Sequence, residues 1–267
     1  MKMQPIMIVG TGSGVGKSLI TAGLCRIFAD MGIKVCPFKA QNMSSFGDKM
    51  SSAQIQQAKA ARVIPDVRMN PIFLMPVGDS KSKLIRMGEE RGVYSAKEYY
   101  AMKDENFTIA KKAYDSLAAE YDLVVLEGAG SPAEINLREL DIVNMRMAEY
   151  AKAKVILVGD ISRGGVFASL KGTVDLVEDR HRSLIKAMII NKFRGDLSIL
   201  APGVSQIEEI TGKPVLGVIP YFEHSLEDED SLDSRAVKKH NLNDLDTLAE
   251  IIKQNVKMEQ ICSLPIY

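Results

Sequence analysis

The sequence predicts an α/β fold of the P-loop NTPase type, a mostly parallel sheet with helices on both faces, and three observations support this. Short apolar runs, typical of buried parallel strands, alternate with segments of helical spacing along most of the chain. The first apolar run leads into a glycine-rich loop and then into a helix. Polar motifs follow the apolar runs, at the strand ends where such sheets bind their ligands.

The first three elements are expected to be a strand, a phosphate-binding loop and a helix. Residues 5–9 are apolar, GTGSGVGKS occupies 10–18, and helical spacing runs over 17–31 until Gly32. Small residues let backbone N–H groups close around phosphate oxygens at the N-terminus of a helix. The strict motif has glycine six residues before the lysine, where this chain has Thr11, with Gly10 one place earlier. We expect a nucleotide site formed by Gly12, Ser13, Gly14, Val15, Gly16, Lys17 and Ser18.

Five further apolar runs predict strands at 33–38, 123–126, 155–158, 187–190 and 215–219. Between them, helices are expected over about 108–120, 142–152, 165–179 and 204–211. Residues 41–107 look less regular and are interpreted as an insertion near the top of the sheet that faces the substrate. The acidic segment 223–234 predicts a solvated linker. Residues 242–261 have helical spacing, and 263–267 form a tail, so the expected division is a domain over 1–232 and a linker, helix and tail over 233–267.

Polar side chains at the predicted strand ends are the candidates for chemistry. Lys17 would reach the β and γ phosphates of ATP, Ser18 would hold Mg²⁺, and Glu127 could join it as a ligand. Lys39 and Arg163 are cations that could face the transferred phosphoryl charge. Asp160 is either a second contact to Mg²⁺ or water, or the N-cap of the next helix. Asparagine and lysine at a strand end suit an adenine edge and a stacking stem, which gives roles to Asn191 and Lys192.

Composition narrows the class of protein. The 34 basic and 34 acidic residues balance, which gives no support for a nucleic-acid or membrane partner, and no apolar run is long enough to span a bilayer. The three cysteines match no zinc or redox motif, and Cys25 and Cys36 are expected to be buried reduced thiols, which fits the cytoplasm. His181, His224 and His240 lack ligand spacing and are expected at the surface.

Several long strings resemble one family. They are FKAQNMS (38–44), EGAGSPAEINLRELDIVNM (127–145), DISRGGVFASL (160–170), INKFRGD (190–196), GVIPY (217–221) and EDSL (229–232). Over about residues 6–232 the chain resembles the ATP-dependent synthetase domain of cobyric acid synthases. More distantly, the glycine-rich loop, Lys39 and EGAG resemble dethiobiotin synthetase and cobyrinic acid a,c-diamide synthase.

The resemblance implies amide formation on a corrinoid, cobyrinic acid a,c-diamide, with ATP and Mg²⁺ and with ammonia released from glutamine. It implies that Lys17, Lys39 and Arg163 are catalytic and that 1–232 is an amide synthetase domain. Related P-loop synthetases predict a homodimer. The family's glutaminase domain has no counterpart here, so a separate glutaminase subunit or free ammonia is expected. The resemblance places the substrate at Gln41, Asn42, Ser44 and Gln54.

Two residues depart from the family pattern. Lys49 stands where the family has an acid, which leaves the neighbouring Asp48 as a candidate Mg²⁺ ligand, and Lys83 stands where the family favours glutamine. These departures keep a second hypothesis open, an ATP-dependent ligase for another polycarboxylate or tetrapyrrole. A third hypothesis is a P-loop switch ATPase that acts as a regulatory module.

Overall fold

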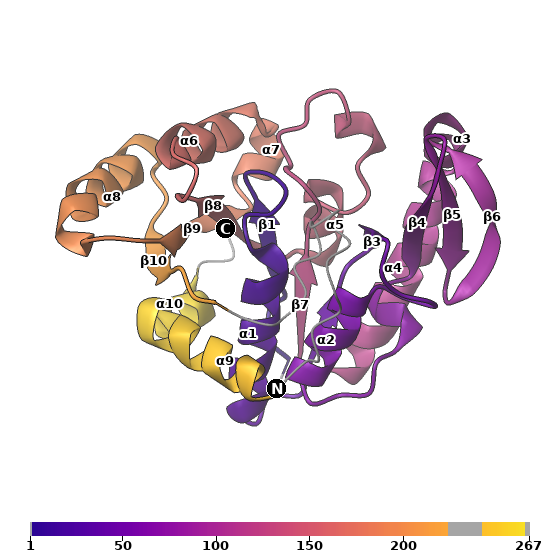
Figure 1. The fold of residues 1–267 in the computed structure, drawn as a ribbon, viewed down its shortest axis with the longest axis horizontal. Coiled ribbons are helices and arrows are strands. Elements are labelled where there is room, and N and C mark those ends of the chain that lie inside the picture. The colour runs from indigo at the N-terminus through magenta and orange to yellow at the C-terminus, as the bar shows by residue number, and fades with distance from the viewer. Residues whose placement is uncertain (1, 224–241, 265–267) are drawn as a thin grey trace.

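The computed structural model describes residues 2–223 and 242–264, built around a six-stranded parallel sheet (Figure 1). Its strands lie in the order β10-β9-β8-β1-β7-β2, and all neighbours pair in parallel. The predicted fold class and all six predicted strands are confirmed. The strands are β1 (Ile6–Gly10), β2 (Val35–Phe38), β7 (Leu123–Glu127), β8 (Lys154–Asp160), β9 (Ile185–Phe193) and β10 (Val215–Pro220).

Helices cover both faces of this sheet because successive strand residues point to opposite sides. Met7 and Ile8 of β1, for example, belong to two different buried clusters. One cluster includes residues of α4 (Lys103–Glu120), α5 (Met145–Ala151), α6 (Val166–Leu176) and α8 (Leu197–Thr211). The other includes residues of α1 (Lys17–Asp30), α9 (Leu242–Asn255) and α10 (Met258–Ser263).

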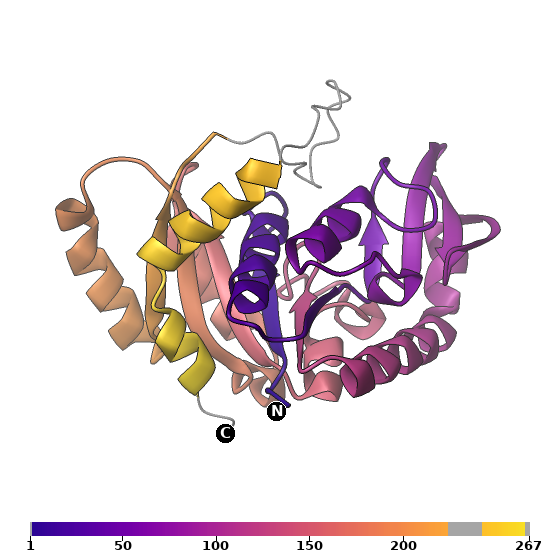
Figure 2. The same cartoon turned by 90° about the horizontal axis from the view of Figure 1, so that it is seen from below.

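The last helices are part of this core. Figure 2 shows α9 beside α1, and a Cβ added to Gly23 of α1 would lie 2.2 Å from Cδ1 of Ile252. Cys25 and Cys36 are fully buried, as expected. No helix in the described ranges combines the length and apolar character needed to cross a bilayer.

The segment over 41–107 looked less regular in sequence than the rest of the chain, but most of it forms strands and helices. It contains a second sheet in the order β3-β4-β5-β6, seen at the right of Figure 1. Its hairpin turns place Asp79, Ser80 and Met87 at positive φ, without the Asn-Gly or Asp-Gly pairs that usually mark such turns. The elements are β3 (Gln41–Met43), α2 (Ser52–Ala60), a 3-10 turn (Val67–Met69), β4 (Ile72–Gly78), β5 (Lys81–Arg86), β6 (Glu89–Ser95) and α3 (Ala96–Ala101).

Several helix bounds also differ from expectation. Helix α4 begins at Lys103, and α8 begins at Leu197, where Asp196 accepts a hydrogen bond from the Ser198 amide at 2.8 Å. Pro202 lies inside α8 instead of preceding it. The helix expected over 242–261 is divided into α9 and α10. A 3-10 turn (Arg138–Leu140) and α7 (Asp179–Arg182) complete the chain, while most of the predicted acidic linker, with His224 and His240, falls outside the described residues.

Candidate functional site

The loop between β1 and α1 has the backbone geometry that binds phosphate. Gly14 and Gly16 have φ values of 70° and 98°, which side chains other than glycine rarely adopt. Gly16 is the N-cap of α1 and supplies no side chain to cap its first turn. The motif's first glycine is Thr11 here, and Gly10 is the position that leaves no room for a side chain. A Cβ at Gly10 would lie 2.5 Å from Cγ2 of Val15. The amides at the start of α1 are therefore arranged around a place for an anion.

Two predicted nucleotide residues hold this loop from the end of β9, which β8 separates from β1. Asn191 donates from Nδ2 to the carbonyl of Val15 at 2.8 Å, and Lys192 donates to the carbonyl of Gly14. Lys192 has φ of 61°, a strained conformation for a residue with a side chain. These contacts support the loop, while contact with adenine stays a prediction.

Asp160 is joined to the same support. Its Oδ2 lies 3.1 Å from the Lys192 ammonium, and its Oδ1 accepts from the backbone and hydroxyl of Ser162 at 2.8 and 2.6 Å. Burial would raise the pKa of Asp160, but the hydrogen bonds from Ser162 and Lys192 hold it below its usual value. The N-cap of α6 is Gly165, so the N-cap alternative for Asp160 is wrong.

Glu127 is the centre of a buried polar cluster at the carboxyl end of β7. It is 1% exposed, and its Oε1 accepts from Ser18 Oγ at 2.7 Å and from Lys39 Nζ at 2.9 Å. Its Oε2 accepts from Nε2 of Gln57 at 2.5 Å and of Gln54 at 3.5 Å. Burial would raise the pKa of Glu127, but the Lys39 ammonium and the hydrogen bonds from Gln57, Lys39 and Ser18 keep it below its usual value.

The sheet topology explains this convergence. Strand β7 lies between β1 and β2, with Ile8 opposite Glu127 and Phe38 opposite Leu126. The residues that follow β1 and β2 therefore meet beside Glu127, which brings together Ser18 and Lys39 although they are far apart in sequence.

Helix α2 supplies Gln57, a contact of Glu127 that the sequence reasoning missed. Gln54 and Gln57 are three residues apart, so they share one face of α2 and both meet Glu127. Oε1 of Gln54 also accepts a hydrogen bond from Nδ2 of Asn42 at 2.6 Å. Asn42 and Gln54, two of the four predicted substrate residues, are thus buried in contacts that support Glu127. The polar spacing within a helix was the available signal for Gln57.

The other predicted residues lie apart from this cluster. Arg163 is exposed in the loop between β8 and α6, and Asp48 is exposed in the loop before α2. Ser44 is buried, and its hydroxyl accepts from the Phe46 amide at 3.1 Å. Gln41 is partly exposed, and its Oε1 accepts from the Tyr99 hydroxyl at 2.5 Å.

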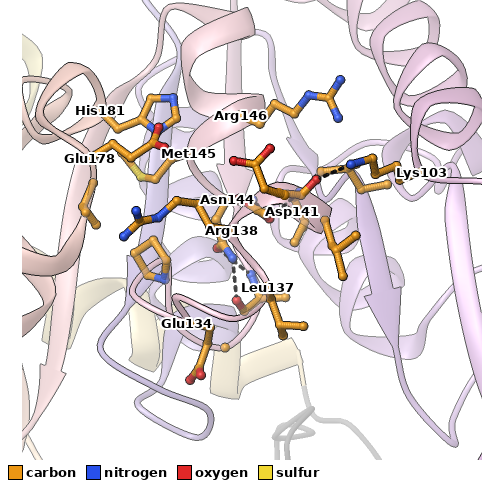
Figure 3. Close-up of a pocket in the computed structure, with 18 of the residues that line it drawn as sticks. Lys103, Glu134, Leu137, Arg138, Asp141, Asn144, Met145, Arg146, Glu178 and His181 are labelled. Atoms are coloured by element: carbon orange, nitrogen blue, oxygen red, sulfur yellow. Dashed lines mark hydrogen bonds and ion pairs between the residues drawn. The ribbon is translucent and has the colours of Figure 1, made fainter. Parts of the chain in front are cut away.

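A hollow of about 510 Å³ opens beside the loop that follows β7 and Glu127 (Figure 3). Its wall includes the loop that follows β7, which Asn144 fixes by accepting from the Ala129 amide at 3.0 Å and donating to the Ala129 carbonyl at 2.8 Å. His181 lines the hollow and is 7% exposed, so the expectation of a surface residue is wrong. Its two ring nitrogens lie 3.2 Å from the carboxylate of Glu149, which is distant in sequence, and 3.5 Å from that of Glu178, three residues earlier.

The side-chain oxygens around Glu127 can be compared with what Mg²⁺ requires, because this ion prefers oxygen ligands. Ser18 and Glu127 present a hydroxyl and a carboxylate to each other, and Oε1 of Gln57 is buried with no hydrogen-bond partner among the described residues. These oxygens fit the ion. Within the described ranges, no group of three or more His, Cys, Asp or Glu side chains offers an alternative metal site.

Comparison with known proteins agrees with this geometry. Residues 6–233 match the model of the CobQ/CobB/MinD/ParA nucleotide binding domain. The cobyric acid synthase of Alkaliphilus metalliredigens is 54% identical over 241 residues, which are 88% of this chain and 48% of the relative. That of Clostridium acetobutylicum is 56% identical over 234 residues, 85% of this chain and 48% of the relative. The chain thus spans about half the length of these curated relatives.

Among solved structures, the signal recognition particle 54 kDa protein of Aeropyrum pernix, in complex with GDP, is 18% identical with a TM-score of 0.50. The match covers 95% of this chain and 50% of that one, and at this identity it shows the fold alone. The family model covers most of the chain, and the glycine loop on a parallel sheet and the Ser18–Glu127–Lys39 cluster agree with it. This chain therefore belongs to the CobQ/CobB/MinD/ParA nucleotide-binding family.

Proposed function

We propose that this chain is an ATP-dependent amide synthetase that converts cobyrinic acid a,c-diamide toward cobyric acid in cobalamin biosynthesis, with ammonia from a separate glutaminase or from solution. The observation that carries the proposal is the convergence of Ser18 and Lys39 on buried Glu127 beside the phosphate loop. The identity of 54–56% to cobyric acid synthases supports the choice of acid.

The chemistry follows from the weakness of a carboxylate as an electrophile, because attack by an amine would have to expel oxide. A carboxylate oxygen of the substrate attacks the γ phosphorus of ATP, ADP leaves, and an acyl phosphate forms. Ammonia then attacks the acyl carbon, phosphate leaves, and the nitrogen loses a proton. In this proposal the ammonium groups of Lys17 and Lys39, which contact the loop and Glu127, offset the negative charge that gathers during transfer.

The remaining residues have supporting roles in this proposal. Ser18 and Glu127, with Gln57 beside them, would hold Mg²⁺, which supplies charge neutralisation between the phosphates. Asn191 and Lys192 hold the loop in its phosphate-binding shape. Arg163, in an exposed loop, would act only if that loop closed over the nucleotide.

The test is mass spectrometry of cobyrinic acid a,c-diamide incubated with the chain, ATP-Mg²⁺ and ammonium, in parallel with glutamine in place of ammonium. We expect successive amide mass shifts with ammonium and none with glutamine alone. If ATP binds but no corrinoid is amidated, the proposal fails. A screen of other polycarboxylates for stimulated phosphate release then tests a related ligase, which the lysines Lys49 and Lys83 favour.

A further inference from the structure

A second hollow, of about 320 Å³, lies in the second sheet and borders the first one. Residues of all four strands, β3 to β6, and of α3 line it. Gln41 and Tyr100 line both hollows, so the two share a border at these side chains. Each volume lies within the range of about 300–1,000 Å³ that ligand sites typically occupy.

The two hollows differ in chemistry. Charged side chains of both signs surround the larger one, including Lys103, Arg138 and Asp141 (Figure 3). The smaller one, called the apolar hollow below, has a largely apolar wall, in contrast to the larger, charged hollow. This wall includes Leu74, Pro76 and the rings of Tyr94, Tyr99 and Tyr100. A compact polar acid would fill the first hollow and leave the second exposed to water.

The charged hollow also adjoins the phosphate loop. Gly130 lines it, and a Cβ at Gly130 would lie 3.9 Å from Oγ of Ser13 in the loop. Gln41 follows Lys39 by two residues. The charged hollow thus lies between the phosphate loop, which it meets at Gly130, and the apolar hollow, which it meets at Gln41 and Tyr100.

We infer that the acid substrate spans both hollows, with Gln41 and Tyr100 as the specificity-determining residues at their junction. One carboxyl group lies at the inner edge beside the loop, the polar substituents occupy the charged hollow, and a broad apolar body covers the apolar hollow. The mixed charges suit an acid that carries both carboxylates, which pair with Arg138 or Lys103, and carboxamides, whose N–H groups donate to acids. The inference rests on the proposed function, because it describes how that function's acid is held.

The experiment is equilibrium titration of the full chain with cobyrinic acid a,c-diamide, followed by visible absorbance. Tyr100→Ala is expected to weaken binding by about tenfold, as loss of a buried aromatic anchor does, and to leave ATP binding unchanged. Met43→Ala, at a residue 53% exposed on the wall of the apolar hollow, is expected to weaken binding in the same direction with less risk to folding. Tyr221→Ala is the matched control, because this tyrosine stacks on Arg194 beyond β10.

Hydrogen exchange on the unaltered chain gives an independent readout. Bound acid is expected to slow exchange in peptides covering 72–86 and 94–101 as well as 127–146. Unchanged affinity in both Tyr100→Ala and Met43→Ala, or protection of 127–146 alone, would overturn the inference and leave the proposed function standing. Binding that protects both regions without any amide product would overturn the proposed function alone, and no binding by the unaltered chain would overturn both.

Discussion

The two sheets of this molecule present side chains of opposite character to the space above them. At the end of the parallel sheet, Lys39, Glu127 and Gln57 are at most 3% exposed and are fixed by mutual hydrogen bonds. On the second sheet, Met43 lines the apolar hollow and is 53% exposed. Buried, hydrogen-bonded charges stabilise developing charge without reorganisation. Exposed apolar groups instead lose water when a ligand covers them.

This difference suggests a division of labour that substitutions can test. Substitutions in the Glu127 cluster should lower both turnover and the free energy of unfolding. The same contacts stabilise the fold and fix the positions of Lys39 and Glu127. Changes on the second sheet should cost affinity for the acid and little else.

The largest effect is expected from Glu127→Gln. It removes the negative charge that pairs with the buried Lys39 ammonium. The free energy of unfolding should therefore fall by about 3–5 kcal/mol. Amide formation should fall by about 10²–10³-fold. Urea denaturation and the rate of amide formation measure the two effects.

Glu90→Gln is the matched control, since its carboxylate pairs with Lys83 at 3.1 Å while 57% exposed. We expect it to change stability by less than about 0.5 kcal/mol. Equal losses in the two variants would contradict the contrast between the sheets.

The same cluster predicts how stability depends on pH. The pKa of Glu127 is lower in the folded chain than its ordinary value of 4.5, so the folded state binds fewer protons and the carboxylate's contribution is present above that value. The contribution is lost as the pH falls below 4.5 toward the folded pKa. Unfolding free energies of the unaltered chain and Glu127→Gln should therefore differ most near neutral pH and converge in acid. A difference that grows in acid would mean that the pKa of Glu127 is raised.

A smaller effect is expected from Gly16→Ala in the phosphate loop. The substitution forces a side chain into φ of 98° and places a Cβ 2.2 Å from Nδ2 of Asn191. We expect a loss of about 1–3 kcal/mol in stability and weaker ATP binding. Gly172→Ala, in the middle of α6 with nothing within 4 Å of the new Cβ, should instead gain about 0.5–1 kcal/mol. Unaltered ATP affinity in Gly16→Ala would show that the loop is not the nucleotide site.

The parallel sheet was predictable because its strands are buried on both faces and are therefore continuous apolar runs. The loop and Glu127 followed from their places at the strand ends. The second sheet was not predictable, because its turns place Asp79, Ser80 and Met87 at positive φ beside Gly78 and Gly88, and neither turn has the Asn-Gly or Asp-Gly pair that marks a hairpin. The contacts of His181 with Glu149 and Asn144 with Ala129 join separate segments, which no local pattern specifies.

The smallest and most discriminating effect concerns the border between the two regions. Tyr99→Phe removes the hydroxyl that donates to Gln41, a bond whose net worth is about 1 kcal/mol or fivefold in affinity. If the second sheet only holds the acid, KM for the acid should rise by this factor while kcat and KM for ATP stay constant. Tyr150→Phe, which removes a hydroxyl bound to Asp115 at 2.7 Å, should change none of these constants. A fall in kcat with an unchanged KM would instead mean that Gln41 acts with its neighbour Lys39 in the chemical step, because a group that acts only in the transition state lowers kcat alone.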